Sequence, residues 1–126
     1  ATGSYAVVVT GAVGNVTSRA ALLFVGVPGP VVAVSAGSDF SLFLTNDGVV
    51  WGMGNNNSGQ LAACAMPRQV LPAPVIFGVQ KIAAGLNHSL FLKTDGTLWS
   101  VGFNVSGQLG DGTHVDRNPI VFVAAP

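Results

Sequence analysis

The chain has 126 residues, with five basic and five acidic side chains and only 8% charged residues in total. Binding to nucleic acid needs clustered positive charge against the phosphates, so this composition argues against a nucleic-acid partner. The most apolar run, residues 20–27, ends before Pro28 and is much shorter than the roughly 20 residues of a membrane-spanning helix, so we expect no membrane insertion. The single cysteine, Cys64, excludes an internal disulfide and a thiolate pair for a metal.

Hydrophobic residues make up 49% of the chain and glycine numbers 17, which favours short buried strands joined by tight turns over helices. We therefore expect an all-β protein. The sequence begins at Ala1, with neither a methionine nor a charged leader before an apolar stretch, which predicts a piece of a longer protein rather than a signal peptide.

Residues 1–27 carry the pattern of a β-hairpin, with strands at 3–10 and 16–25 and a turn between them. The pattern resembles the last two strands of a bacterial immunoglobulin-like domain. In such domains Gly-x-Tyr begins one strand, as Gly3 and Tyr5 do, and the next strand follows Ser-x-x-Ala-x-Leu-x-Val, as at 18–25. The resemblance implies an incomplete immunoglobulin-like hairpin at 1–27, with Ala1 in place of the usual acidic residue. The Pro-Gly-Pro run predicts a linker at 28–31.

An internal repeat organises residues 32–126. A shift of 48 residues aligns 37–61 with 85–109, and 14 of the 25 aligned positions are identical without a gap. A fixed period of this length is typical of propellers and solenoids. We therefore expect two repeats, about 32–79 and 80–126.

Each repeat is expected to form four short strands. The expected strands are 32–36, 41–44, 49–51 and 74–77 in the first repeat, and 80–84, 89–92, 97–99 and 119–122 in the second. The second strand of each repeat has Leu on one face and Ser and Phe on the other, as in a sheet covered on both sides. The Asp-Gly pairs at 47–48 and 95–96 predict hairpin turns. The fourth strands align three residues out of register with the shift of 48, which predicts a longer loop around 66–72 in the first repeat.

A known family carries a similar sequence. The run IAAGLNHSLFLKTDGTLW at 82–99, followed by Asn104 and by GQLGDG at 107–112, is similar to a repeat of the regulator of chromosome condensation family. The resemblance covers 32–123 and implies a β-propeller, normally seven-bladed, of which this chain supplies two four-stranded antiparallel blades. The first repeat departs from the family pattern, with Phe40 in place of His and AAC at 62–64 in place of Gly-Asp-Gly, so the resemblance defines its loop less closely than the loop of the second repeat.

Candidate catalytic residues have simpler explanations. His88 could act as a base, but its counterpart is Phe40, so the position accepts an apolar ring and we interpret it as structural. His114 lies in a polar loop without a nucleophile, base and orienting group that could be named. Asp47 and Asp95 could form a pair of carboxylates, but both precede a hairpin glycine, where backbone geometry favours Asp.

The two tryptophans, Trp51 and Trp99, could stack on a ligand, but their equivalent positions favour packing between blades. We therefore expect no catalytic residue, no metal site and no cofactor.

The expected function is a non-enzymatic scaffold that binds a protein or a glycan, in a large bacterial extracellular or cell-envelope repeat protein. Function in such repeats is carried by the loops. The expected partner-binding loop residues are Asn55, Asn56, Asn57, Phe103, Asn104 and Asp111. As an alternative, the family resemblance implies guanine-nucleotide exchange or other regulatory binding to a small GTPase. Two blades alone leave apolar flanks uncovered, which predicts that the isolated chain associates.

Overall fold

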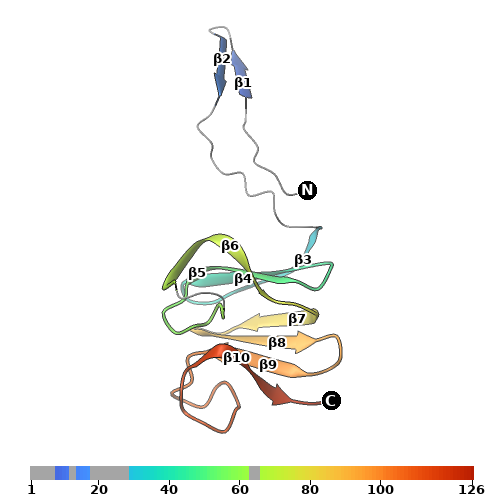
Figure 1. Ribbon diagram of the computed structural model, residues 1–126, viewed down its shortest axis with the longest axis vertical. Coiled ribbons are helices and arrows are strands. Elements are labelled where there is room, and N and C mark those ends of the chain that lie inside the picture. Colours follow the sequence, from blue (N-terminus) through green and yellow to red (C-terminus); the bar gives the residue numbers. More distant parts are fainter. Residues whose placement is uncertain (1–7, 12–13, 18–28, 63–65) are drawn as a thin grey trace.

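The computed structural model describes residues 8–11, 14–17, 29–62 and 66–126 (Figure 1). These residues form ten strands in three antiparallel sheets. They include no helix, so no helix among them could cross a membrane. The all-β fold expected from composition is confirmed.

The N-terminal sheet is a two-stranded hairpin. β1 (Val8–Gly11) pairs with β2 (Gly14–Thr17), with Val8 opposite Thr17 and Gly11 opposite Gly14. The outer parts of the predicted strands, at 3–7 and 18–25, lie outside the described residues.

The first four-stranded sheet, here called the first blade, contains β3 (Val31–Ala36), β4 (Phe40–Thr45), β5 (Val50–Asn55) and β6 (Arg68–Ile76). The second blade contains β7 (Val79–Ala84), β8 (His88–Lys93), β9 (Leu98–Gly102) and β10 (Arg117–Ala124). In each blade every strand pairs with the next along the chain. The Asp-Gly turns form as predicted, because Gly48 and Gly96 adopt φ values of 84° and 86° that an L side chain rarely takes.

The strand registers of the two blades are identical after a shift of 48. Phe43 pairs with Trp51 in the first blade and Phe91 with Trp99 in the second. The irregularities of pairing repeat as well. The register shifts between Val31 and Ala33 in the first blade, and at the equivalent place, between Val79 and Lys81, in the second. The repeat found in the sequence is therefore a repeat of backbone geometry.

The expected three-residue offset of the fourth strands is wrong. Gly54 pairs with Gln69, and its counterpart Gly102 pairs with Arg117, again 48 residues on. β6 begins at Arg68, so most of the expected loop at 66–72 is strand. The similarity of PVIF at 74–77 to PIVF at 119–122 was misleading because Pro74 opposes Trp51, whereas the residue opposite Trp99 is Phe122.

The blades stack with unlike faces together, one above the other in Figure 1. On each blade we call the side that carries the β4 or β8 leucines the Leu face and the opposite side the Phe face. The first blade buries its Leu face, with Leu42 1% and Leu44 3% exposed. The second blade buries its Phe face, with Phe91 and Val101 both 0% exposed. These four side chains share one apolar core cluster.

Polar contacts fix the two blades to each other. Ser89 Oγ, fully buried, donates to the carbonyl of Gln60 at 2.7 Å. The amide of Ala84 donates to Ser35 Oγ at 2.9 Å, and the amide of Ser38 donates to the carbonyl of Leu86 at 3.0 Å. These bonds join one strand, one turn and one loop of the first blade to the second, so the stacking has a defined register.

Candidate partner-binding site

The loops that connect the third and fourth strands leave the same edge of the two blades. We call this edge the loop rim, and it comprises residues 55–62 and 66–67 of the first blade and 103–116 of the second. The hairpin turns at 46–48 and 94–96 lie at the opposite ends of β5 and β9. The rim is thus presented by two rigid sheets rather than by a free segment.

The first half of each rim loop is built around a buried asparagine. Asn56 is 5% exposed and Asn104 is 0% exposed. Each side-chain oxygen accepts a bond of 2.9 Å from the amide five residues later, at Leu61 and Leu109 respectively. A buried amide without a partner costs about 1–3 kcal/mol, so these bonds stabilise both loops.

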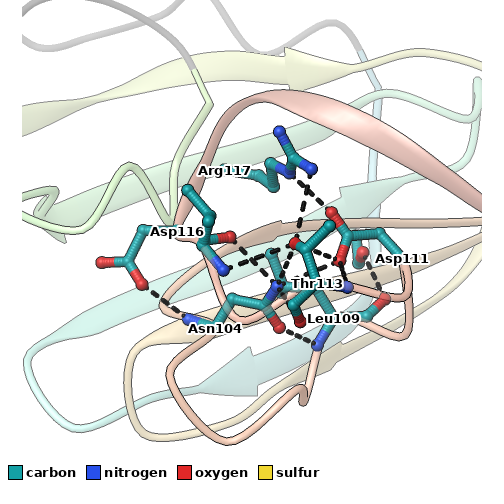
Figure 2. A network of polar contacts seen from close by, with 8 residues as sticks. Asn104, Leu109, Asp111, Thr113, Asp116 and Arg117 are labelled. Carbon is teal, nitrogen blue, oxygen red and sulfur yellow. Dashed lines mark hydrogen bonds and ion pairs between the residues drawn. The ribbon is translucent and has the colours of Figure 1, made fainter.

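The second half of the loop in the second blade contains a network that converges on Asn104 (Figure 2). The Asn104 side-chain nitrogen donates to Asp111 Oδ1 at 3.1 Å and to the carbonyls of Thr113 and Val115 at 3.1 and 3.0 Å. The Asn104 backbone amide donates to Asp116 Oδ1 at 2.8 Å. The Asn104 side chain thereby links three positions of the loop, residues 111, 113 and 115.

Asp111 connects this network to β10. Its carboxylate accepts a bond from the Thr113 hydroxyl at 2.7 Å and forms an ion pair with Arg117 Nε at 2.5 Å. The Thr113 hydroxyl, followed by the Arg117 guanidinium, holds the pKa of Asp111 well below its usual range. The Asp111 side chain is only 7% exposed, so its carboxylate interacts with groups of the loop and of β10 and is little exposed to solvent.

The loop of the first blade departs from this arrangement. Asn56 donates instead to the carbonyl of Met66 at 3.1 Å. Ala62 occupies the position of Gly110 and keeps its left-handed backbone, with φ of 53° against 71°. The counterparts of Asp111 and Gly112, residues 63 and 64, lie outside the described residues.

A polar cleft of about 390 Å³ opens where the first rim loop meets the start of β10. Its lining residues are Asn56, Asn57, Ser58, Gly59, Met66, Pro67, Asp116, Arg117 and Asn118. A Cβ at Gly59 would lie 2.5 Å from Asn118 Cβ, so only glycine permits the two blades to approach this closely. The cleft therefore draws on both blades and depends on their stacking.

The six expected partner-binding residues lie in three kinds of environment. Asn56, Asn104 and Asp111 are held inside the loops by the bonds described above. Asn55 and Phe103 are half-buried at the ends of the loops, and Asn57 is exposed and lines the cleft. A role in partner contact stays a prediction for all six.

Sequence reasoning missed the contribution of the β10 start to the cleft. Asp116, Arg117 and Asn118 come from the second blade, 59 or more positions beyond Asn57 in the chain numbering. Only the stacking brings these segments together. The period of 48 makes positions in the two repeats equivalent, but it does not say which segments of neighbouring repeats meet, so the sequence held no signal for this contact.

His88 has the structural environment that its counterpart predicted. A Cβ added to Gly85 would lie 2.0 Å from His88 Cε1, and one added to Gly37 would lie 2.0 Å from Phe40 Cε1. Both rings therefore lie on a glycine, and burial lowers the pKa of His88. His114 is exposed, and its Nδ1 is 3.1 Å from the carbonyl of Val105.

The aspartates and tryptophans also serve local structure. Asp95 Oδ1 accepts bonds from the Thr97 hydroxyl and amide, which lower the pKa of Asp95. Asp47 Oδ1 accepts from the Thr45 hydroxyl in the equivalent turn. Trp99 packs against the core between the blades, as expected. Trp51 instead stacks on the Phe43 ring, at 6.2 Å between centroids, and is not part of that core, so the expected packing between the blades is wrong for Trp51. Within the described part of the chain, no three His, Cys, Asp or Glu side chains are grouped to hold a metal.

Four-stranded antiparallel sheets that follow each other along the chain and stack face to face define consecutive blades of a β-propeller. Two family models of the regulator of chromosome condensation (RCC1) repeat match the chain, one at residues 31–60 and 79–108 and the other at 47–92. The chain therefore carries RCC1 repeats. No curated protein sequence matches it.

Solved RCC1-type structures are similar to the chain. Yeast RCC1 (Prp20) bound to Kap60 superposes with a TM-score of 0.71 and 26% identity over 90% of this chain. Human WBSCR16 gives 0.70 and 28% over 88%, and Prp20p of Saccharomyces cerevisiae, described with its binding properties to Gsp1p and histones, gives 0.70 and 28% over 90%. The chain spans 26%, 31% and 27% of these proteins, respectively.

Proposed function

We propose that the chain is a non-enzymatic binding scaffold whose loop rim recognises a protein or a glycan. The observation that carries this proposal is the polar cleft, which lies between two rigidly stacked blades and is lined by amide, hydroxyl and charged groups from both. Such groups can form hydrogen bonds with a polypeptide backbone or with sugar hydroxyls. The description of Prp20p as binding Gsp1p and histones supports a protein as the first class to test.

The proposal includes a location in a bacterial extracellular or cell-envelope protein. Its support is the resemblance of residues 1–27 to the end of a bacterial immunoglobulin-like domain. Sequencing the gene on both sides of the segment tests it, with further blades downstream and a signal peptide upstream as the expected result. A eukaryotic gene would contradict it.

The rim is tested by binding assays with a matched pair of variants. Asn57→Arg places a long charged side chain in the cleft, whereas Asn46→Arg makes the same change at an exposed turn at the opposite end of β5. Immobilised panels of bacterial surface proteins and of glycans are probed with the wild type and both variants. We expect a ligand whose binding falls at least tenfold for Asn57→Arg and is unchanged for Asn46→Arg. Equal losses, or turnover of a small substrate that requires residues 32–123, would contradict the proposal.

The alternative, regulatory binding to a small GTPase, predicts a different readout. An exchange factor accelerates the release of labelled GDP from its GTPase, and a scaffold does not. We expect no acceleration with a panel of small GTPases. Acceleration that Asn57→Arg abolishes would favour the alternative over the scaffold.

A further inference from the structure

The junction of the two blades contains a second cleft, on the side opposite to the loop rim. We call this side, on the right in Figure 1, the hairpin rim, and it comprises the turns at 46–48 and 94–96 and the link at 77–78. The cleft has a volume of about 500 Å³. It is lined by Val32 and residues 44–48 of the first blade, and by residues 78–80 and Thr94. The next blade of a propeller stacks on a face and not on a rim, so further blades would not cover this junction.

Backbone hydrogen bonds hold the segments around the cleft. The amide of Val79 donates to the carbonyl of Gly48 at 3.0 Å, which joins the second blade to the hairpin turn of the first. The amide of Thr94 donates to the carbonyl of Gly78 at 2.9 Å, which joins the link to the hairpin turn of the second blade. An equivalent of this second bond occurs 48 residues earlier in the chain. The cleft is therefore a built feature of the repeat, with a frame that exists before any ligand binds.

The inner lining of the cleft is apolar. Leu44 and Val79 are only 3% and 2% exposed, and the Thr45 side chain between them in the lining is 1% exposed. Val32 on the wall of the cleft is 59% exposed, so a branched aliphatic side chain faces solvent beside a closed apolar surface. An aliphatic side chain of a ligand would remove this area from water, which is favourable in proportion to the area covered.

The polar groups of the cleft are mainly acceptors. Among the described residues that line it, only Asp47 is charged. Asp47 Oδ1 accepts from the Thr45 hydroxyl at 2.5 Å, and no described residue bonds to Asp47 Oδ2. The Gln80 side-chain nitrogen donates to the Lys93 carbonyl at 3.0 Å, so the Gln80 oxygen is left to accept. The Lys93 ammonium lies 5.1 Å from the centre of the Trp99 ring and does not neutralise Asp47. A cationic donor is the group that matches these acceptors.

We propose that the hairpin-rim cleft binds an exposed segment of a partner protein in which a lysine or arginine stands beside an aliphatic side chain. The aliphatic side chain packs on Leu44, Val79 and Val32, and the cationic group pairs with Asp47 and Gln80. Charge complementarity selects this occupant, because a neutral glycan offers no cation and an acidic segment would be repelled. The site is separate from the loop rim and does not depend on the partner proposed there.

The experiment selects ligands from a random peptide library displayed on phage, with the full 126-residue chain immobilised as the target. Enriched peptides are synthesised, and their dissociation constants are measured by fluorescence anisotropy at low and at high salt. We expect the enriched peptides to share a lysine or arginine next to Leu, Ile or Val. Their binding should weaken as the salt concentration rises, because an exposed charge pair is screened.

A matched pair of substitutions isolates the carboxylate. Asp47→Asn removes the charge but keeps a side-chain oxygen that can accept from the Thr45 hydroxyl, so the turn is retained. Asp95→Asn makes the same change in the equivalent turn of the second blade, outside the lining of the cleft. We expect Asp47→Asn to weaken binding by about threefold to tenfold and to reduce its salt dependence, and Asp95→Asn to leave both unchanged. Circular dichroism and thermal melting establish that each variant is folded.

A second pair of variants separates this cleft from the loop rim. Asn46→Arg adds a long cationic side chain to the hairpin-rim cleft and should abolish binding of the enriched peptides, whereas Asn57→Arg should leave it unchanged. This is the reverse of the order expected for a ligand of the loop rim. Enriched peptides without a shared basic and aliphatic pair, equal losses for Asp47→Asn and Asp95→Asn, or binding lost only with Asn57→Arg would each overturn the proposal. Each of these results leaves the proposed function of the loop rim to its own test.

Discussion

The first and second blades have the same strand register, but they bury opposite sides. Leu42 is covered and Leu90 is half-buried, whereas Phe91 is covered and Phe43 is half-buried. The four positions are occupied by the same residue types in both repeats, so the sequence of a blade does not determine which of its faces is buried. The position of the neighbouring blade determines which face is buried. In a repeat protein the energetic contribution of a residue is therefore set by the order of the repeats as well as by its own position.

The largest expected effect tests whether the two blades bury opposite faces. Phe91→Ala should lower the free energy of unfolding by about 3–5 kcal/mol, and Phe43→Ala by about 1–2 kcal/mol, because only Phe91 leaves a closed cavity. For the leucines the order reverses, with about 2–5 kcal/mol for Leu42→Ala and about 1 kcal/mol for Leu90→Ala.

These values come from urea denaturation at concentrations where the chain is monomeric, so that association does not cover the outer faces. Phe77→Ala, in the exposed link between the blades, is the control and should change the stability by less than about 0.5 kcal/mol. Equal losses at the two phenylalanines would show that the blade interface does not exist in solution.

The second prediction compares the two rim loops. Asn104→Ala removes the partner of the buried Leu109 amide and the bonds to the carbonyls of Thr113 and Val115, and we expect a loss of about 3 kcal/mol. Asn56→Ala removes the partner of the Leu61 amide and a bond to the Met66 carbonyl, and we expect a loss of about 1–2 kcal/mol. Thermal melting of both variants measures the difference. A larger loss for Asn56→Ala would mean that the Asp111 network holds its loop without Asn104.

The sequence alone predicted most of the blade architecture, because strands and hairpin turns follow from local patterns. The Asp-Gly turns and the alternation of Leu with Ser and Phe in β4 and β8 are examples. It failed where two short motifs resembled each other by chance, as with Pro74 and Pro119, because pairing depends on register along the whole strand and not on four residues.

The cleft and the loop interiors were less predictable. Asn56 and Asn104 are conspicuous polar residues in a polar loop, and nothing local distinguishes a buried asparagine from an exposed one. Their repetition 48 residues apart was the available clue, since both repeats build the same loop start. The pairing of Asp111 with Arg117 required the three-dimensional course of the loop.

The third prediction concerns a loop position that has the same backbone conformation in both blades but a different residue in each. Ala62 has the left-handed conformation that Gly110 has in the second blade. Ala62→Gly should relieve this strain and stabilise the chain by about 0.5–1 kcal/mol after the greater freedom of glycine in the unfolded chain is counted. Gly110→Ala should destabilise it by about 1–2 kcal/mol. If both changes destabilise, the left-handed turn in the first blade is not populated in solution.

The smallest expected effect concerns the carboxylate of Asp111. Among the described residues, only the rim loop of the second blade contains such an ion-paired carboxylate. The pKa of Asp111 is lowered in the folded chain by Thr113 and Arg117, so its carboxylate stabilises the fold fully above the ordinary value of 3.8. That contribution is lost as the pH falls below this value toward the lower pKa of the folded state. Asp111→Asn should therefore lower the melting temperature at neutral pH, and the difference from the wild type should narrow on acidification below about pH 4.

The exposed Asp39, in the turn before β4, provides the control for this titration. Asp39→Asn removes the same charge without removing a bond to Thr113 or Arg117, so it separates the effect of net charge from the effect of the lost bonds. Narrowing for Asp39→Asn equal to that for Asp111→Asn would assign the effect to net charge. Narrowing for Asp111→Asn alone would show that the ion pair with Arg117, and not overall charge, separates the second rim loop from the first.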